Sequence, residues 1–191
     1  MRLTLLPLTV VGCALAVWPA PIRSQAPTRS DTARYFSLLP SLDDLPAGSK
    51  LLIQDQREGT TFVRVFAVSG LGVTTGLRLF DTPDSASAWY QRMVAMTPRE
   101  FAAEVGEGLA ARGLSADSVR ADTLALTTGN RHACAIGRFY HVGGVFVMTQ
   151  GVVANSRYAV VFEVGGTGPD DEIIALTRRL AALADQRIAG P

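Results

Sequence analysis

Two residues on one predicted strand, His132 and Cys134, have side chains that could carry out chemistry together. Side chains alternate along a strand, so these two share a face, and a thiolate beside an imidazole could act as a nucleophile or bind a soft metal. A zinc site needs four ligands, however, and a cysteine among Ala133, Ala135 and Ile136 is more often a small buried side chain. We therefore expect Cys134 to be buried and inert, and the alternative is a small enzyme that uses the Cys134–His132 pair.

A second group of residues could form a surface that binds a ligand or a partner. Trp89 and Tyr90 lie on a predicted helix, and Arg138, Tyr140 and His141 lie at the end of a predicted strand. Aromatic and arginine side chains combine a large contact area with polar groups, and they are enriched where proteins bind partners. If the helix packs beside that strand, the five residues form one candidate binding surface. The alternative is that each of them only packs or decorates a turn.

Several common chemistries are excluded by what the sequence lacks. It has no nucleophile elbow, no zinc-protease helix, no Walker loop and no paired cysteine motif. The glycines at 70, 72 and 76 have the wrong spacing for a dinucleotide loop and lead into a strand. The acidic pair Asp43–Asp44 lacks the further oxygen ligands that calcium needs. We therefore expect no cofactor and no metal.

The charge of the chain is nearly balanced, with 18 Lys and Arg against 17 Asp and Glu and a formal net charge of +1. Proteins that bind nucleic acid usually carry a basic patch or a strong excess of positive charge. The sequence therefore predicts no nucleic-acid partner. An unknown protein or a small apolar ligand remains as the expected partner.

The N-terminus is typical of a secretory signal. Arg2 precedes an uncharged, mostly apolar run from Leu3 to Trp18, which is shorter than the roughly 20 residues that a membrane-spanning helix needs. We predict a signal peptide over 1–26, a lead-in over 27–50 with a short helix and a loop, and one domain over 51–191. The exported protein would be periplasmic or extracellular and without a stable membrane span. Acylation of Cys13, in a lipobox-like setting, is the alternative.

Seven stretches rich in β-branched and aromatic residues, separated by turn formers, are predicted strands: 51–56, 60–69, 72–80, 119–126, 131–142, 145–153 and 158–164. Helical spacing follows Asp81-Thr82-Pro83, the capping box Thr97-Pro98-Arg99-Glu100, and Gly168-Pro169. A shorter helix capped by Asp31 is predicted in the lead-in. Tight turns between consecutive strands favour antiparallel pairing. The predicted fold is α+β: a largely antiparallel sheet of about seven strands covered by three helices.

This element order resembles the PsbP/Mog1-type sandwich over roughly 51–188, a layout found in many small exported bacterial proteins. The phrase from Leu38 to Gly48 is also similar to the opening of exported proteins from GC-rich bacteria. Neither resemblance supplies a catalytic or binding residue. The function expected from the sequence is a non-enzymatic binding or accessory module of the bacterial cell envelope. Besides the Cys/His enzyme, the sequence leaves a carrier of an apolar small ligand as an alternative, which needs a cavity near Trp89.

Overall fold

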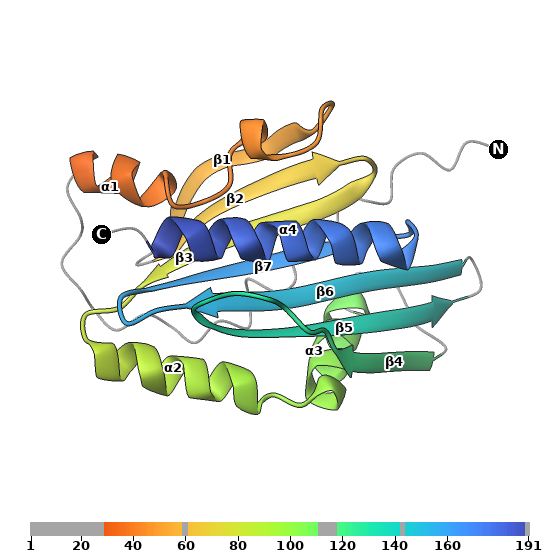
Figure 1. The fold of residues 1–191 in the computed structure, drawn as a ribbon. Helices are drawn as coiled ribbons and strands as arrows, with labels where there is room; N and C mark the ends of the chain where they lie inside the picture. Colours follow the sequence, from red (N-terminus) through yellow and green to blue (C-terminus); the bar gives the residue numbers. More distant parts are fainter. Residues whose placement is uncertain (1–28, 59–60, 111–117, 142–143, 190–191) are drawn as a thin grey trace.

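The computed structural model describes residues 29–58, 61–110, 118–141 and 144–189. In these ranges seven strands form one sheet in the order β1-β2-β3-β7-β6-β5-β4, with every neighbouring pair antiparallel (Figure 1). The strands are β1 (Lys50–Glu58), β2 (Thr61–Val68), β3 (Leu71–Leu79), β4 (Ser118–Thr123), β5 (Arg131–His141), β6 (Gly144–Ala154) and β7 (Tyr158–Gly166). The predicted α+β class and antiparallel sheet are confirmed.

Four helices in the described ranges pack against this sheet: α1 (Arg29–Phe36), α2 (Pro83–Ala95), α3 (Pro98–Ala110) and α4 (Asp170–Ile188). Three of these helices, α2, α3 and α4, correspond to the three predicted to cover the sheet. The short lead-in helix α1 also covers it, because its Phe36 packs in the main core. Asp31 lies inside α1 and does not cap it, so that detail of the prediction is wrong.

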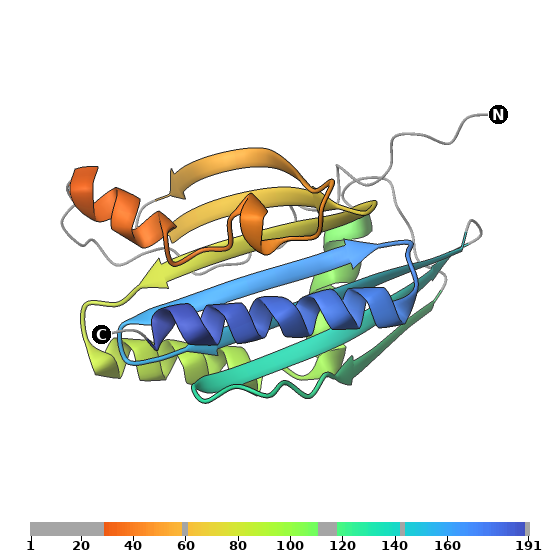
Figure 2. The ribbon, with the colours of Figure 1, turned by 45° about the horizontal axis from the view of Figure 1, so that its top comes forward.

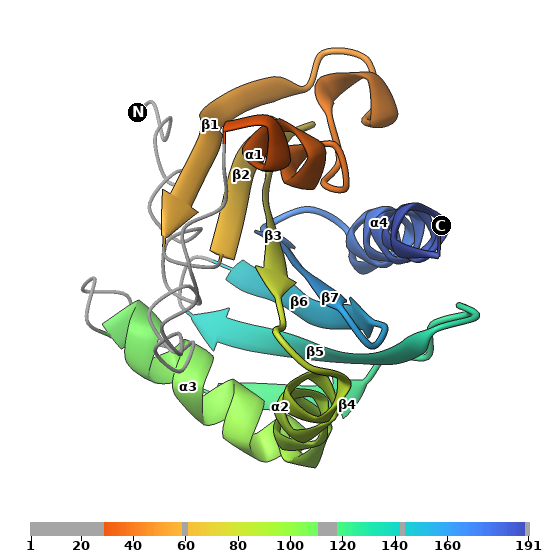
Figure 3. The ribbon, with the colours of Figure 1, turned by 90° about the vertical axis from the view of Figure 1, so that its left-hand side faces the viewer.

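The centre of the sheet is the pairing of β3 with β7, which joins the first three strands to the last four. In β3, Val73, Thr75 and Leu77 alternate with Thr74 and Arg78, and both sets are buried. A strand that is covered on both faces needs a layer of helices or loops on each side. The two layers are visible when the sheet is seen from its end (Figure 3).

One layer holds α1 and α4, and the other holds α2 and α3 (Figures 2 and 3). Alternation along the strands explains the division, because neighbouring residues on a strand face opposite layers. Val153 and Val160, which are paired across β6 and β7, belong to the core cluster under α4. Val152 and Val161, one position along, pack with Trp89 of α2.

The larger core lies under α4, which crosses β6 and β7 (Figure 1). It contains Phe36 and Leu39 from the lead-in, Phe62 and Phe66 from β2, and the buried stripe of α4 at Ile173, Leu176, Leu180 and Ile188. The lead-in therefore contributes to the core of the domain.

A loop between α1 and β1 is fastened to the end of α4. Asp44, in the short 3-10 helix η2 (Leu42–Asp44), accepts hydrogen bonds from the Ser41 amide at 2.7 Å and from Arg187 Nη2 at 2.6 Å. Arg187 also donates to the Leu39 carbonyl. Burial alone would raise the pKa of Asp44, but the bonds from Ser41 and Arg187 outweigh it and lower that pKa. These contacts give the Leu38-to-Gly48 phrase a structural role.

The two helices of the other layer begin where their capping residues predict. Thr82 Oγ1 accepts the Ser85 amide at 3.1 Å, and Thr97 Oγ1 accepts the Glu100 amide at 3.2 Å. Glu100 in turn accepts the Thr97 amide at 2.7 Å, which completes the predicted capping box. Only Met96 and Thr97 separate α2 from α3, and the two helices run in different directions over one face of the sheet (Figure 3).

Candidate ligand-binding site

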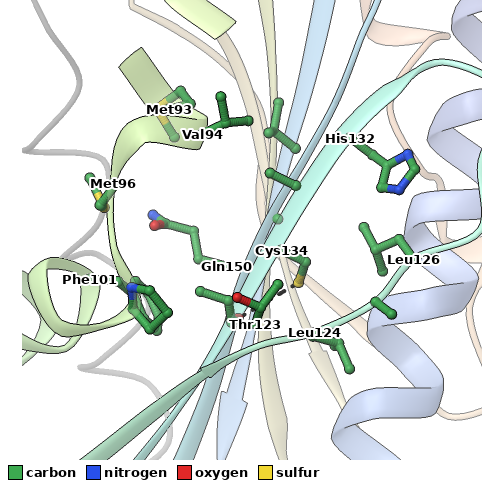
Figure 4. Close-up of a pocket in the computed structure, with 16 residues that line it drawn as sticks. Met93, Val94, Met96, Phe101, Thr123, Leu124, Leu126, His132, Cys134 and Gln150 are labelled. Atoms are coloured by element: carbon green, nitrogen blue, oxygen red, sulfur yellow. Dashed lines mark hydrogen bonds between the residues drawn. The ribbon is translucent and has the colours of Figure 1, made fainter. Parts of the chain in front are cut away.

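A pocket of about 380 Å³ lies between helices α2 and α3 and strands β5 and β6 (Figure 4). Its volume falls at the lower end of the range of small-ligand sites, roughly 300–1,000 Å³. Most of the lining is apolar: Met93, Val94, Met96, Pro98, Phe101, Leu124, Ala125, Leu126, Ala133, Ala135, Gly151 and Val152. Thr123, His132, Cys134 and Gln150 complete it. Val94, Thr123 and Ala125 are exposed, so the pocket opens to solvent at their side.

The pocket forms because the edge strand β4 is shorter than its neighbour β5. The strand predicted to reach Leu126 ends at Thr123, whose pairing partner is Ala135. Beyond that point the Leu124 amide still donates to the Cys134 carbonyl at 2.9 Å, but Leu124 and Leu126 turn into the core under α4. Burial of the two leucines therefore outweighs continued strand pairing, and β5 is left with a gap at its edge.

Helix α2 is attached to β5 at this gap. The hydroxyl of Tyr90 donates to the His132 carbonyl at 2.8 Å, where a partner strand would otherwise supply an amide. Arg131 donates to Ser87 at 3.1 Å, and its guanidinium lies 5.9 Å from the centre of the Tyr90 ring. These contacts fix the position of α2 and hence of Met93, which lines the pocket one turn further on.

Gln150, which lines the pocket, is paired with a buried carboxyl group that lies behind the lining. The side chain of Gln150 points from β6 into the space between the strands and the helices (Figure 4). Its Nε2 donates to Oε1 of Glu163, on the neighbouring strand β7, at 3.0 Å. Glu163 is 3% exposed, and its other carboxyl oxygen has no hydrogen-bond partner among the described residues. Burial raises the pKa of Glu163 to about 7, against a smaller lowering by the Gln150 bond.

The predicted Cys134–His132 pair shares a face, but the structure does not join the two side chains. Cys134 Sγ contacts the Ala135 carbonyl at 3.7 Å, whereas His132 Nδ1 lies 2.7 Å from the hydroxyl of Thr128. Cys134 is 5% exposed, and burial raises the pKa of its thiol to about 12. A thiolate, the form that acts as nucleophile or metal ligand, is therefore strongly disfavoured at neutral pH.

We expect the native thiol of Cys134 to react with a disulfide reagent at least about tenfold more slowly than the same thiol in the unfolded chain, because both its burial and its raised pKa suppress the thiolate. Native and denatured labelling, followed by mass, measures the ratio. Equal or faster labelling of the native thiol would contradict this assignment and would restore the Cys134–His132 enzyme.

The five predicted surface residues do not come together on one face. Trp89 and Tyr90 pack between α2 and the sheet. Arg138 Nε bonds Asp170 of α4 at 2.5 Å, so Arg138 and the residue two positions on, Tyr140, project toward the α4 layer. The side chain of His141 lies outside the described residues. Helix α2 does pack against β5, as the prediction assumed, but on the opposite face from Arg138 and Tyr140.

Sequence reasoning missed Gln150, Glu163 and the two methionines of the pocket. One signal could have indicated Glu163: it is a carboxylate inside the apolar strand sequence from Val160 to Val164, and a charge there is buried on either face. Nothing local indicates Gln150, because its importance comes from pairing with Glu163 across two strands.

Within the described residues, no group of three or more His, Cys, Asp or Glu side chains could hold a metal ion. None of the helices in these ranges combines the length and the apolar character required to cross a membrane.

No family model matches the chain, and no curated protein matches it. Among solved structures, the extracellular domain of PknH from Mycobacterium tuberculosis matches with a TM-score of 0.50 and 10% identity, covering 83% of this chain and 97% of that chain. LpqN of the same organism, described as involved in cell envelope biogenesis, matches with a TM-score of 0.32 and 13% identity over 78% and 79%. The chain is thus similar in fold to the extracellular domain of PknH. The PknH match shows a shared fold, and the LpqN match is too distant to bear on it.

Proposed function

We propose that this chain is an exported domain of the cell envelope that binds a small, largely apolar ligand in the pocket between helices α2 and α3 and strands β5 and β6. The observation that carries the proposal is the pocket itself, with about 380 Å³ of space and a mostly apolar lining. Open pockets of this size and composition are the usual sites of small-molecule binding. The buried, protonated thiol of Cys134 favours binding over catalysis.

Two observations support export. The N-terminus has the pattern of a secretory signal, and the matching PknH structure is an extracellular domain. We expect the protein recovered from the envelope fraction to lack roughly its first 24–26 residues. Intact-mass measurement tests this, and a product that retains Leu3–Trp18, or carries a lipid on Cys13, would contradict the soluble form.

Octanol is a suitable first probe of the pocket, because it joins an apolar chain to one small polar group. We expect calorimetric titration to show one-to-one binding. We expect Ala135→Leu to weaken it by about tenfold or more, because the added carbons displace part of the octanol chain and each methylene of a ligand is worth roughly 10- to 200-fold in a hydrophobic pocket. Ala135 lines the pocket and is half-buried, so the larger side chain occupies ligand space.

The matched control is Ala88→Leu, an exposed position on α2 that does not line the pocket. It should bind octanol as the parent protein does. Absence of octanol binding, or equal binding by Ala135→Leu and the parent, would overturn the proposed function. Thermal unfolding of each variant shows whether the fold is retained.

A further inference from the structure

The polar groups of the pocket are few, and Gln150 is the one at its centre. Of the other polar lining residues, Thr123 is exposed at the opening, and His132 Nδ1 is already engaged by Thr128 and by the Asn130 carbonyl. In Figure 4 the amide of Gln150 lies between the strands and the side chains of α2 and α3. A ligand that fills the apolar space therefore brings its polar end to Gln150.

The orientation of the Gln150 amide follows from its partner. Its Nε2 donates to Oε1 of Glu163, and turning the amide over would place its oxygen against that carboxyl oxygen, which can only accept while Glu163 is ionised. When Glu163 is protonated on Oε2, which has no hydrogen-bond partner among the described residues, Oε1 remains an acceptor and the same bond persists. In this orientation Gln150 presents its amide oxygen away from Glu163.

That amide oxygen receives no hydrogen bond from the residues that the structure describes. An amide oxygen can only accept a hydrogen bond, and an acceptor left unpaired in an apolar site costs free energy. A ligand that ends in an ether oxygen has no hydrogen to donate to the amide oxygen of Gln150. A carboxylate is worse, because it adds a negative charge close to the buried carboxyl of Glu163.

We propose that the pocket selects apolar ligands whose polar end donates a hydrogen bond, a hydroxyl or an ammonium group, and that Oε1 of Gln150 accepts it. Gln150 is the residue that sets this preference, and Glu163 positions it. This inference rests on the proposed function, since it names the class of ligand that the same pocket takes.

The test compares ligands that differ only at the polar end: octanol, methyl octyl ether, octylamine and octanoate. We expect octanol to bind about 2- to 10-fold more tightly than methyl octyl ether, which is the range of one net hydrogen bond. Octanoate should bind most weakly. Octylamine against octanol distinguishes an ammonium from a hydroxyl as the preferred donor. This comparison uses the unaltered protein and does not depend on any variant folding.

Two variants assign the preference to Gln150. Gln150→Leu should bind octanol and methyl octyl ether equally, whereas Glu163→Gln keeps an acceptor for Nε2 of Gln150 and should keep the preference. Equal binding of the two ligands by the parent protein, or a preference that survives in Gln150→Leu, would overturn the inference while leaving the proposed function intact. If none of the four ligands binds, the proposed function itself fails.

Discussion

Replacing Glu163 by glutamine is expected to raise the free energy of unfolding at pH 8 by about 3 kcal/mol and to leave it nearly unchanged near pH 4. The carboxyl group is buried, and its pKa rises from the ordinary value of 4.5 to about 7 in the folded chain. Glutamine has the shape of the protonated acid and keeps an oxygen that can accept from Gln150. It removes only the cost of ionising a buried group.

The direction in which stability changes with pH follows from proton binding to Glu163. Between pH 4.5 and about 7 the folded chain holds a proton on Glu163 that the unfolded chain has lost. The contribution of this group to stability is therefore fully present at low pH, decreases as the pH rises through that window, and is constant above it.

Urea unfolding of the parent and of Glu163→Gln across pH 4 to 8 measures the difference between the two proteins. Glu172→Gln, at an exposed position on α4, is the matched control and should follow the parent at every pH. If the parent and Glu163→Gln show the same pH dependence, Glu163 is not a buried carboxyl with a raised pKa, and its assignment as the buried partner of Gln150 is wrong.

Replacing Trp89 by alanine is expected to lower the free energy of unfolding by about 3–5 kcal/mol, the usual cost of deleting a large aromatic side chain from a core. Trp89 is 2% exposed and packs on Val152 and Val161 of the sheet. Its ring centre lies 5.5 Å from that of Phe80. Without these contacts α2 loses its main attachment to the sheet, and octanol binding should weaken as well.

The variant Trp89→Phe distinguishes the contribution of ring packing to stability from that of the indole N–H. The indole Nε1 is buried and has no hydrogen-bond partner in the described structure, so phenylalanine removes an unsatisfied donor while keeping an aromatic ring. We expect Trp89→Phe to cost much less than Trp89→Ala in urea unfolding. A small cost for Trp89→Ala would show that Trp89 is not part of the core and would return it to the candidate surface residues.

Much of the local structure could be predicted because it depends on patterns along the chain. Alternation in β3 predicted a strand with at least one covered face, and the structure buries both. The capping residues Thr82 and Thr97 located the starts of two helices. The same alternation placed Cys134 in a covered position, as observed. Each of these features is decided by near neighbours in the sequence.

The candidate site could not be predicted, because it depends on which tertiary contacts are the more stable. Leu124 and Leu126 pack under α4, and this packing ends β4 at Thr123, but nothing in the local sequence indicates it. The sequence also does not specify which face of β5 meets α2, and that choice separates Trp89 from Tyr140. Alternation along a strand predicts which residues share a face of the sheet. Only the tertiary structure shows which helix covers that face.

The central claim, that this pocket binds an apolar ligand, is tested most directly by the methionine methyl signals. The chain has four methionines, of which Met93 and Met96 line the pocket, while Met148 is buried beside it without lining it. In protein labelled with ¹³C at the methionine methyls, octanol titration should shift the Met93 and Met96 signals in a saturable manner and move Met148 much less. Unchanged Met93 and Met96 signals, or equal shifts at all of these methyls, would contradict the account.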